Sequence, residues 1–266
     1  MLWQHPVHPA LTGLVERIVG YDDRPDPTSV HHGLPGPATT VILSFDEPLD
    51  VGWASGSERG RRWRLASGLH VGPALIHTHG HQHGIQLSLT PAGTRALLGV
   101  PMAGLTHAFE APLGLPDGLH ARLAELDWPE RFALLDAHLL SLVGRARTEV
   151  PADLAHGWAL LARRAGRVGV AELASTLGWS RRHLTARFTA EFGLPPREVA
   201  RLHRFAAALR LARSRTPWSQ VASRAGFADQ PHLVREFGAL ARQTPTQWAA
   251  EVFPNVQDAG APAGGS

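Results

Sequence analysis

Residues 168–248 contain one pattern twice, and this repeat constrains the fold more than any other feature of the chain. In each copy an Ala is followed by a Gly-aromatic pair, a Leu, a Phe and a Pro. The first copy has Ala174, Gly178-Trp179, Leu184, Phe188 and Pro196, and the second has Ala222, Gly226-Phe227, Leu233, Phe237 and Pro245. The offset is 48 residues up to the Gly-aromatic pair and 49 after it. Two copies are too few for a solenoid, so the repeat predicts a pair of small modules.

Each copy has the outline of a helix-turn-helix unit, in which a first helix supports a second one across a tight turn. Such a turn needs a residue that tolerates positive φ, and the two helices touch at a small residue. Gly178 and Gly226 meet the first requirement, and Ala174 and Ala222 meet the second. The Leu and Phe of each copy, spaced i and i+4, should face inward.

The outward face of each second helix carries side chains that suit DNA bases. Arginine can pair with guanine through two hydrogen bonds and glutamine with adenine, and small apolar groups contact the thymine methyl. This face offers Arg181, Arg182, Thr185, Ala186 and Arg187 in the first copy, and Gln230, Pro231, His232, Val234 and Arg235 in the second. Ser180 is placed to cap the first of these helices and Asp229 the second.

Residues 170–214 and 218–248 resemble the DNA-binding region of the AraC/XylS family of transcription regulators. Both units, the arginine-rich connecting helix and the second Gly-Phe pair match in order. The resemblance implies that two recognition helices, about 181–192 and 230–240, enter successive major-groove segments of double-stranded DNA. Helix 196–214 would hold them about one helical turn, roughly 34 Å, apart.

The resemblance, carried over position by position, assigns individual DNA contacts. With the outward-face argument it predicts base contacts from Arg181, Arg182, Thr185, Ala186, Gln230, Pro231, Val234 and Arg235, and phosphate contacts from Ser180, Arg187, Arg204, His232 and Arg242. Family members usually have Gly where this chain has Arg242, and Arg would be strained in a left-handed cap. The helix therefore ends differently there, or Arg242 contacts phosphate. Pro231 and Val234 cannot donate hydrogen bonds to bases, so we expect the first unit to discriminate more.

Charge is distributed unevenly along the chain. The 26 basic residues are all Arg, and the net charge is +3. Residues 151–253 are strongly positive, whereas residues 1–150 have an excess of acids. This asymmetry predicts a polyanionic partner for the C-terminal part. The alternative is a solvated arginine-rich helical surface.

Several classes of protein are excluded or disfavoured by composition. There is no Cys, which excludes disulfides, cysteine-ligated zinc and thiol nucleophiles. The DNA repair proteins that accept an alkyl group on Cys and share this DNA-binding region are excluded for the same reason. The first residues lack a secretory pattern, and no stretch of about 18 apolar residues occurs. We therefore expect a soluble, cytoplasmic protein without a membrane partner.

The N-terminal half alternates short apolar runs with Gly- and Pro-containing turns, followed by helical patterns. The expected elements are a helix at 3–20, a loop at 22–37, strands at 41–45, 49–53, 63–71, 74–79 and 84–89, and helices at 91–98, 117–126 and 129–147. This order predicts an α+β domain with a small antiparallel sandwich or barrel. It resembles the cupin-like domain that precedes the DNA-binding region in many of these regulators, which implies effector binding or dimerisation.

These patterns divide the chain into three parts. Residues 1–150 are expected to form the β-rich domain with its C-terminal helices. Residues 151–253 should form an all-α domain with helix-turn-helix units at about 168–193 and 217–242, joined by a long helix. Residues 254–266 are rich in Gly and Ala and are expected to be disordered.

The regulator hypothesis does not account for a histidine tract in the segment IHTHGHQHG. It contains His77, His79, His81 and His83, which on a continuous strand would share one face and could hold zinc, nickel or copper. Gly80 and Gly84 interrupt the strand and favour a hairpin tip, and no nearby carboxylate stands out as a further ligand. A metal site, an effector contact and a solvated polar turn all remain open.

We predict a sequence-specific transcription regulator that is not an enzyme and needs no cofactor. Its partners would be double-stranded promoter or operator DNA and an unknown small-molecule effector, with RNA polymerase and a second copy of the chain as further candidates. The alternative is a metal-dependent cupin-type enzyme or metal sensor that uses the histidine tract and is fused to a DNA-binding domain.

Overall fold

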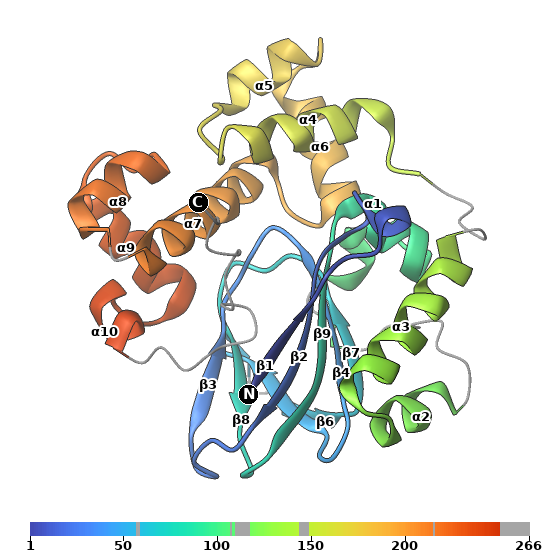
Figure 1. Ribbon diagram of the computed structural model, residues 1–266. Coiled ribbons are helices and arrows are strands. Elements are labelled where there is room, and N and C mark those ends of the chain that lie inside the picture. The colour runs from blue at the N-terminus through green and yellow to red at the C-terminus, as the bar shows by residue number, and fades with distance from the viewer. Residues whose placement is uncertain (57–58, 107, 110–117, 144–148, 215, 251–266) are drawn as a thin grey trace, which may run out of the picture.

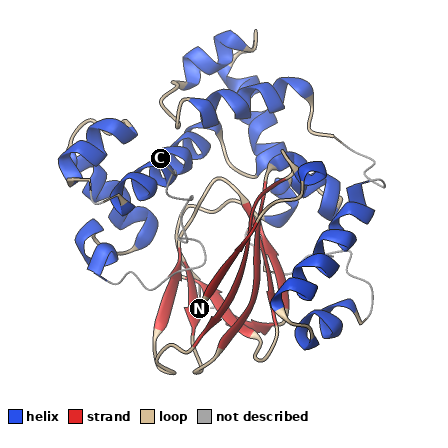
Figure 2. Cartoon of the chain, viewed as in Figure 1, coloured by secondary structure: helices blue, strands red, loops and turns tan. Residues whose placement is uncertain are grey.

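The structure is a computed structural model that describes residues 1–56, 59–106, 108–109, 118–143, 149–214 and 216–250. Two antiparallel sheets and several helices make up the N-terminal half, and the rest of the described chain is helical (Figures 1 and 2). The predicted fold class is therefore confirmed. The tail that we expect to be disordered, residues 254–266, lies outside the described residues.

The two sheets face each other as a sandwich. The larger sheet has the strand order β1 (Leu2–His5), β2 (Val15–Asp23), β9 (Gln82–Leu89), β4 (Thr39–Ser44) and β7 (Arg64–Ser67). The smaller has the order β3 (Val30–Gly33), β8 (Ala74–His77), β5 (Leu49–Trp53) and β6 (Arg59–Arg62). Residues of both sheets, including Ile42, Val51 and Ile76, form the apolar core between them.

Helices cover the outer face of the larger sheet. They are α1 (Pro91–Gly93), which continues as the π-helix η2 (Thr94–Leu98), the 3-10 helix η3 (Met102–Leu105), α2 (Leu119–Glu125) and α3 (Trp128–Val143). Ile85, Leu87 and Leu89 alternate along β9 and are buried under these helices. On the opposite face of β9, Gln86 and Ser88 line a cavity.

The remaining helices form one bundle around a long central helix. They are α4 (Ala152–Arg163), α5 (Val170–Thr176), α6 (Arg181–Phe192), α7 (Pro196–Arg213), α8 (Trp218–Ala225), α9 (Gln230–Ala241) and α10 (Pro245–Ala250). One apolar core spans α4 to α7, α9 and α10, and a second lies between α7, α8 and α9. The two helix-turn-helix units therefore share α7 as a common support. No helix among the described residues has the length and hydropathy that a membrane span requires.

The helix predicted at 3–20 is wrong. This segment contains β1, the 3-10 helix η1 (Pro9–Leu11) and β2. β2 is hydrogen-bonded to β1 on one side and to β9 on the other, and these long-range pairs override the helical spacing of its apolar residues. A Cβ at Gly20 would lie 2.1 Å from the Trp128 ring, so this position of β2 must be Gly for α3 to pack on the sheet.

Two further predictions for this half need correction. The loop predicted at 22–37 contains β3. The strand predicted at 63–71 contains only β7, because after β7 the chain passes from the larger sheet to the smaller one, where β8 begins. Residues 78–81 likewise cross between sheets, since β8 and β9 belong to different sheets, and are not a hairpin tip. Gly84 lies within β9, where a Cβ would be 2.3 Å from the Leu43 carbonyl oxygen.

Candidate DNA-binding surface and adjacent cavity

The turn of each helix-turn-helix unit has a left-handed glycine. Gly178 has a φ of 69° and Gly226 a φ of 87°. The backbone N–H of the following aromatic residue donates to the carbonyl of Ala174 in the first unit and of Ala222 in the second, both at 2.9 Å. Both alanines are buried, so each turn closes over a small side chain.

The repeated Leu and Phe of each second helix are fully buried. Leu184, Phe188, Leu233 and Phe237 each have 0% exposure. Phe237 meets Phe205 of α7 edge to face, with ring centroids 5.1 Å apart. These contacts fix the inward faces of α6 and α9, which leaves their other faces to solvent.

All eight residues predicted to contact bases are exposed. They are Arg181, Arg182, Thr185 and Ala186 on α6, and Gln230, Pro231, Val234 and Arg235 on α9. The helix starts beneath them are capped, because Ser180 Oγ accepts from the backbone N–H of His183 at 3.2 Å and Asp229 Oδ1 accepts from that of His232 at 2.6 Å. Each recognition helix thus presents its first two turns from a fixed start.

The five residues predicted to contact phosphates lie in different environments. Ser180, Arg187 and Arg242 are exposed. His232 is half-buried, and its Nδ1 accepts from the backbone N–H of Ala228 at 3.3 Å. Arg204 is also half-buried, and burial lowers the pKa of its guanidinium, which donates to the Gly166 carbonyl at 2.7 Å. Arg204 therefore supports the helix packing in this structure, a role that the sequence prediction did not include.

Arg242 ends α9 in a left-handed conformation, at the position where members of the AraC/XylS family usually have Gly. Its φ is 55°, and its backbone N–H donates to the Gly238 carbonyl at 3.0 Å. A left-handed residue other than Gly costs roughly 1–2 kcal/mol. The helix therefore ends in a left-handed cap although the residue is Arg, and the strained Arg242 is exposed.

The C-terminal end of α6 is held by the N-terminal half. Arg95 of η2 donates two hydrogen bonds to the Glu191 carboxylate, at 2.7 and 2.6 Å, and the two side chains are only 17% and 6% exposed. Beside this pair, a Cβ at Gly193 would lie 1.9 Å from Thr106 Oγ1. No local sequence signal links Arg95 to Glu191, and sequence reasoning missed the contact.

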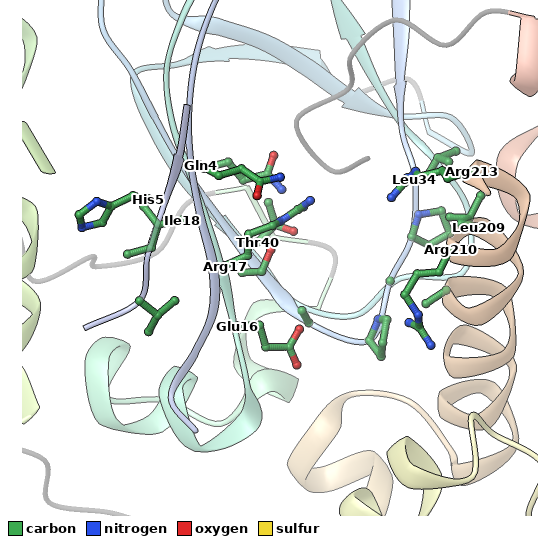
Figure 3. Close-up of a pocket in the computed structure, with 18 of the residues that line it drawn as sticks. Gln4, His5, Glu16, Arg17, Ile18, Leu34, Thr40, Leu209, Arg210 and Arg213 are labelled. Atoms are coloured by element: carbon green, nitrogen blue, oxygen red, sulfur yellow. The ribbon is translucent and has the colours of Figure 1, made fainter. Parts of the chain in front are cut away.

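A cavity of about 670 Å³ separates the β-sandwich from α7. Arg210, Leu209 and Arg213 of α7 line one wall, and Glu16 and Arg17 of β2 lie across from them (Figure 3). The remaining lining residues come mainly from β1, β2, β9 and the segment 34–38, and include apolar side chains. The cavity thus combines guanidinium groups and the Glu16 carboxylate with apolar surface. Sequence analysis missed it because its two walls are distant in the chain.

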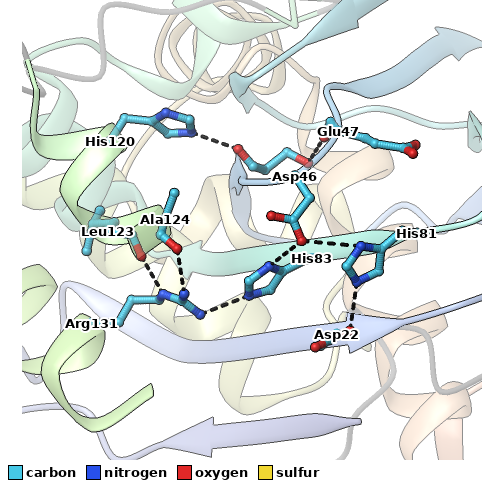
Figure 4. Close-up of polar contacts among 10 residues, drawn as sticks. Asp22, Asp46, Glu47, His81, His83, His120, Leu123, Ala124 and Arg131 are labelled. Carbon is cyan, nitrogen blue, oxygen red and sulfur yellow. Dashed lines mark hydrogen bonds and ion pairs between the residues drawn. The ribbon is translucent and has the colours of Figure 1, made fainter. Parts of the chain in front are cut away.

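The histidine tract contacts carboxylates rather than an open ligand site. His81 Nε2 lies 2.9 Å from Asp22 Oδ1, and His83 Nδ1 lies 2.8 Å from Asp46 Oδ2 (Figure 4). No carboxylate stands out beside the tract in the sequence, and the fold brings Asp22 and Asp46 to it from other strands. His83 Nε2 is 2.9 Å from an Arg131 nitrogen, so it accepts from the guanidinium.

The remaining members of the tract lie apart from this cluster. His79 Nε2 is 2.7 Å from Asp50 Oδ2, in the smaller sheet. His77 is the last residue of β8. No group of three or more His, Asp or Glu among the described residues is arranged to hold a metal ion. The pairs instead connect the strand ends to each other and, through Arg131, to α3.

His203 of α7 is a buried histidine that nothing in the described structure hydrogen-bonds at Nε2. It meets the Trp158 ring edge to face at 5.2 Å. Burial, with a smaller contribution from the charge of Arg210, lowers the pKa of His203 to about 4. The unfolded chain, with an ordinary histidine pKa of about 6.5, therefore binds more protons than the folded chain between these pH values, and stability falls as pH drops through this window.

Replacing His203 with Phe should remove this part of the pH dependence. At pH 5 the wild-type chain should lose about 2 kcal/mol of unfolding free energy through His203, relative to pH 7.5. His203→Phe keeps an aromatic ring beside Trp158 and cannot be protonated. Urea unfolding of both proteins at the two pH values checks this. An equal loss of stability in both would show that His203 is not the group responsible.

The helical half of the chain matches a known family. The sequence profile of a family described as a helix-turn-helix domain matches residues 173–251. These residues contain both turns and both exposed helix faces. Residues 173–251 are a helix-turn-helix domain of the AraC type. No curated protein matches the chain.

Solved structures similar to the chain match both its N-terminal half and its helical half. ToxT from Vibrio cholerae has a TM-score of 0.59 and 12% identity, covering 88% of this chain and 98% of ToxT. ToxT with a bound unsaturated fatty acid has a TM-score of 0.56 and 10% identity, covering 87% and 94%. ToxT bound to (E)-4-(8-methylnaphthalen-1-yl)but-3-enoic acid has a TM-score of 0.54 and 12% identity, covering 88% and 98%. At these identities the likeness establishes a shared fold.

Proposed function

We propose that this protein is a sequence-specific transcription regulator whose AraC-type domain inserts α6 and α9 into successive major-groove segments of promoter DNA. The observation that carries the proposal is the matched pair of capped helices with exposed Arg181, Arg182, Gln230 and Arg235 on a shared support, α7. Arginine and glutamine on the first turns of such helices read base edges, and further arginines bind phosphate. We also propose that the boundary between the N-terminal β-rich domain and the DNA-binding domain lies at about residue 150.

The direct test is DNA binding by the full chain across a salt series. Fluorescence anisotropy with fragments of its own upstream region should give a log-log slope near −5 to −7, if about 6–8 phosphates are neutralised. Arg182→Ala should weaken binding to the preferred fragment by roughly 1–3 kcal/mol and relax preference at one base pair. An equal loss on random DNA would make Arg182 a phosphate contact, and a shallow slope without a preferred fragment would overturn the regulator proposal.

The cavity beside α7 supports a role in effector binding. The two ToxT ligands named above are carboxylic acids with a large apolar part, and this cavity offers Arg17 and Arg210 together with apolar side chains such as Leu34 and Leu209. A carboxylate there would gain charge-assisted hydrogen bonds. Because α7 supports both helix-turn-helix units, a ligand between α7 and the sandwich would bear directly on the orientation of the DNA-binding domain.

Oleate is a suitable probe of this cavity. Isothermal titration below the micelle concentration should detect binding to the wild-type chain, and Arg210→Met should weaken it by about tenfold or more, since a hydrogen bond to a charged group contributes about 1.5–3 kcal/mol. Arg122, an exposed residue of α2, provides the matched control: Arg122→Met should bind oleate as the wild type does. Equal binding by all three proteins would place oleate elsewhere, and no binding would remove long-chain carboxylates as the effector class.

A further inference from the structure

The turn between α4 and α5 carries three exposed arginines outside the predicted DNA contacts. Arg163, Arg164 and Arg167 are all exposed, and none of them forms an ion pair with another described residue. Arg167 Nε donates to the Arg164 carbonyl at 3.2 Å, which keeps these two residues together. We call residues 163–167 the basic turn.

The basic turn has a constrained backbone. Ala165 has a φ of 47° and Gly166 a φ of 69°, and the Gly166 N–H donates to the Leu161 carbonyl at 2.8 Å. A Cβ at Gly166 would lie 1.9 Å from the Ala200 carbonyl oxygen, so the turn rests directly on α7. A left-handed alanine is uncommon and costs free energy, and such strain persists where the surroundings impose it, often at functional sites.

The basic turn lies where the two helix-turn-helix units meet. The Arg167 side chain passes over the turn of the second unit, because a Cβ at Gly226 would be only 2.5 Å from Arg167 Cγ. In the chain, the basic turn comes just before α5, the first helix of the first unit. The first helix of such a unit crosses the DNA backbone. The basic turn therefore contacts the second unit and immediately precedes α5, the helix of the first unit that is expected to cross the DNA backbone.

The charge of the basic turn is not explained by helix stabilisation alone. Arg163 and Arg164 lie at the C-terminal end of α4, where cations interact favourably with the helix dipole by about 0.3–1 kcal/mol. Arg167 lies beyond the helix end and adds a third positive charge to the two already there. Like charges held together in this way repel one another unless an anion binds them.

We propose that the basic turn is a third DNA-contact element, which binds backbone phosphates between the two major-groove segments. Arg164 and Arg167 supply the guanidinium groups, and the left-handed backbone at Ala165 and Gly166 holds them in place on α7. This inference rests on the proposed DNA-binding function and adds affinity without sequence preference, because phosphate contacts carry no direct base information.

The experiment measures binding of the full chain to a fluorescein-labelled random-sequence duplex of about 40 base pairs at several KCl concentrations. The test variant combines Arg164→Gln with Arg167→Met, which keeps the apolar stem over Gly226. Each lost phosphate contact should make the log-log slope less steep by about 0.9, giving a change of roughly 1.8. Arg122→Met is the control for loss of one exposed charge far from this surface and should leave the slope unchanged.

The outcomes separate this inference from the proposed function. A wild-type chain that binds DNA, with a less steep slope in the test variant, supports the basic turn. A wild-type slope in the variant, with DNA binding retained, overturns it and leaves the regulator proposal intact. If the wild type binds no DNA, both fail. Should the double variant melt below the assay temperature, Arg164→Gln alone is measured, with an expected slope change of about 0.9.

Discussion

Replacing Phe237 with Ala should lower the free energy of unfolding by about 3–5 kcal/mol. The Phe237 ring is 0% exposed and lies 5.1 Å from Phe205, 5.7 Å from Trp248 and 6.2 Å from Trp218, centroid to centroid. Removing it leaves a cavity where α7, α8, α9 and α10 meet, and large rings on every side cannot close such a space. Urea unfolding followed by tryptophan fluorescence measures the loss.

A control at an exposed position of the same helix makes this result specific. Val234 is 37% exposed on α9, so Val234→Ala should change stability by no more than about 0.5 kcal/mol. If Phe237→Ala cost no more than Val234→Ala, the inward assignment of Phe237 would be wrong.

Replacing Arg95 with Met should cost about 3–5 kcal/mol, because it leaves the Glu191 carboxylate buried without a counterion. Glu191 is 6% exposed, and both of its oxygens accept hydrogen bonds from Arg95. We expect the N-terminal half to separate from α6 at a lower urea concentration than it does in the wild type. Circular dichroism and tryptophan fluorescence recorded together follow it.

The double variant Arg95→Met with Glu191→Met isolates the ion pair. Replacing both members of a buried pair with apolar residues of similar size is often neutral or stabilising, so the double variant should recover most of the stability that Arg95→Met loses. If the two substitutions were additive instead, Arg95 and Glu191 would not be coupled, and the ion pair would not be what holds α6 against η2.

The helical half was predicted closely because its signals are local. A left-handed glycine after a small residue specifies each turn, and Ser180 and Asp229 specify where α6 and α9 begin, so the helix starts at residues 181 and 230 could be predicted directly. Apolar residues at i and i+4 then identify the inward face, which also identifies the exposed one. The repetition of the same signals 48 or 49 residues later supports both readings.

The N-terminal half was predicted as a class but not in detail. Leu11, Leu14, Val15 and Ile18 have helical spacing, yet β2 pairs with β1 and β9 over separations that the local pattern does not encode. The histidine tract failed for a related reason. Asp22 and Asp46 reach it from other strands, and only the sheet topology brings those carboxylates near.

The sequence by itself determined that this chain carries two helix-turn-helix units, which residues of each face inward and which are left to solvent, because turn conformation, capping and helical period depend on neighbours within a few residues. The tertiary structure alone decided the Arg95–Glu191 pair, the cavity between α7 and the sandwich, and the position of the basic turn beside Gly226. Each joins segments far apart in the chain, and their contact depends on how sheets and helices pack rather than on any local pattern.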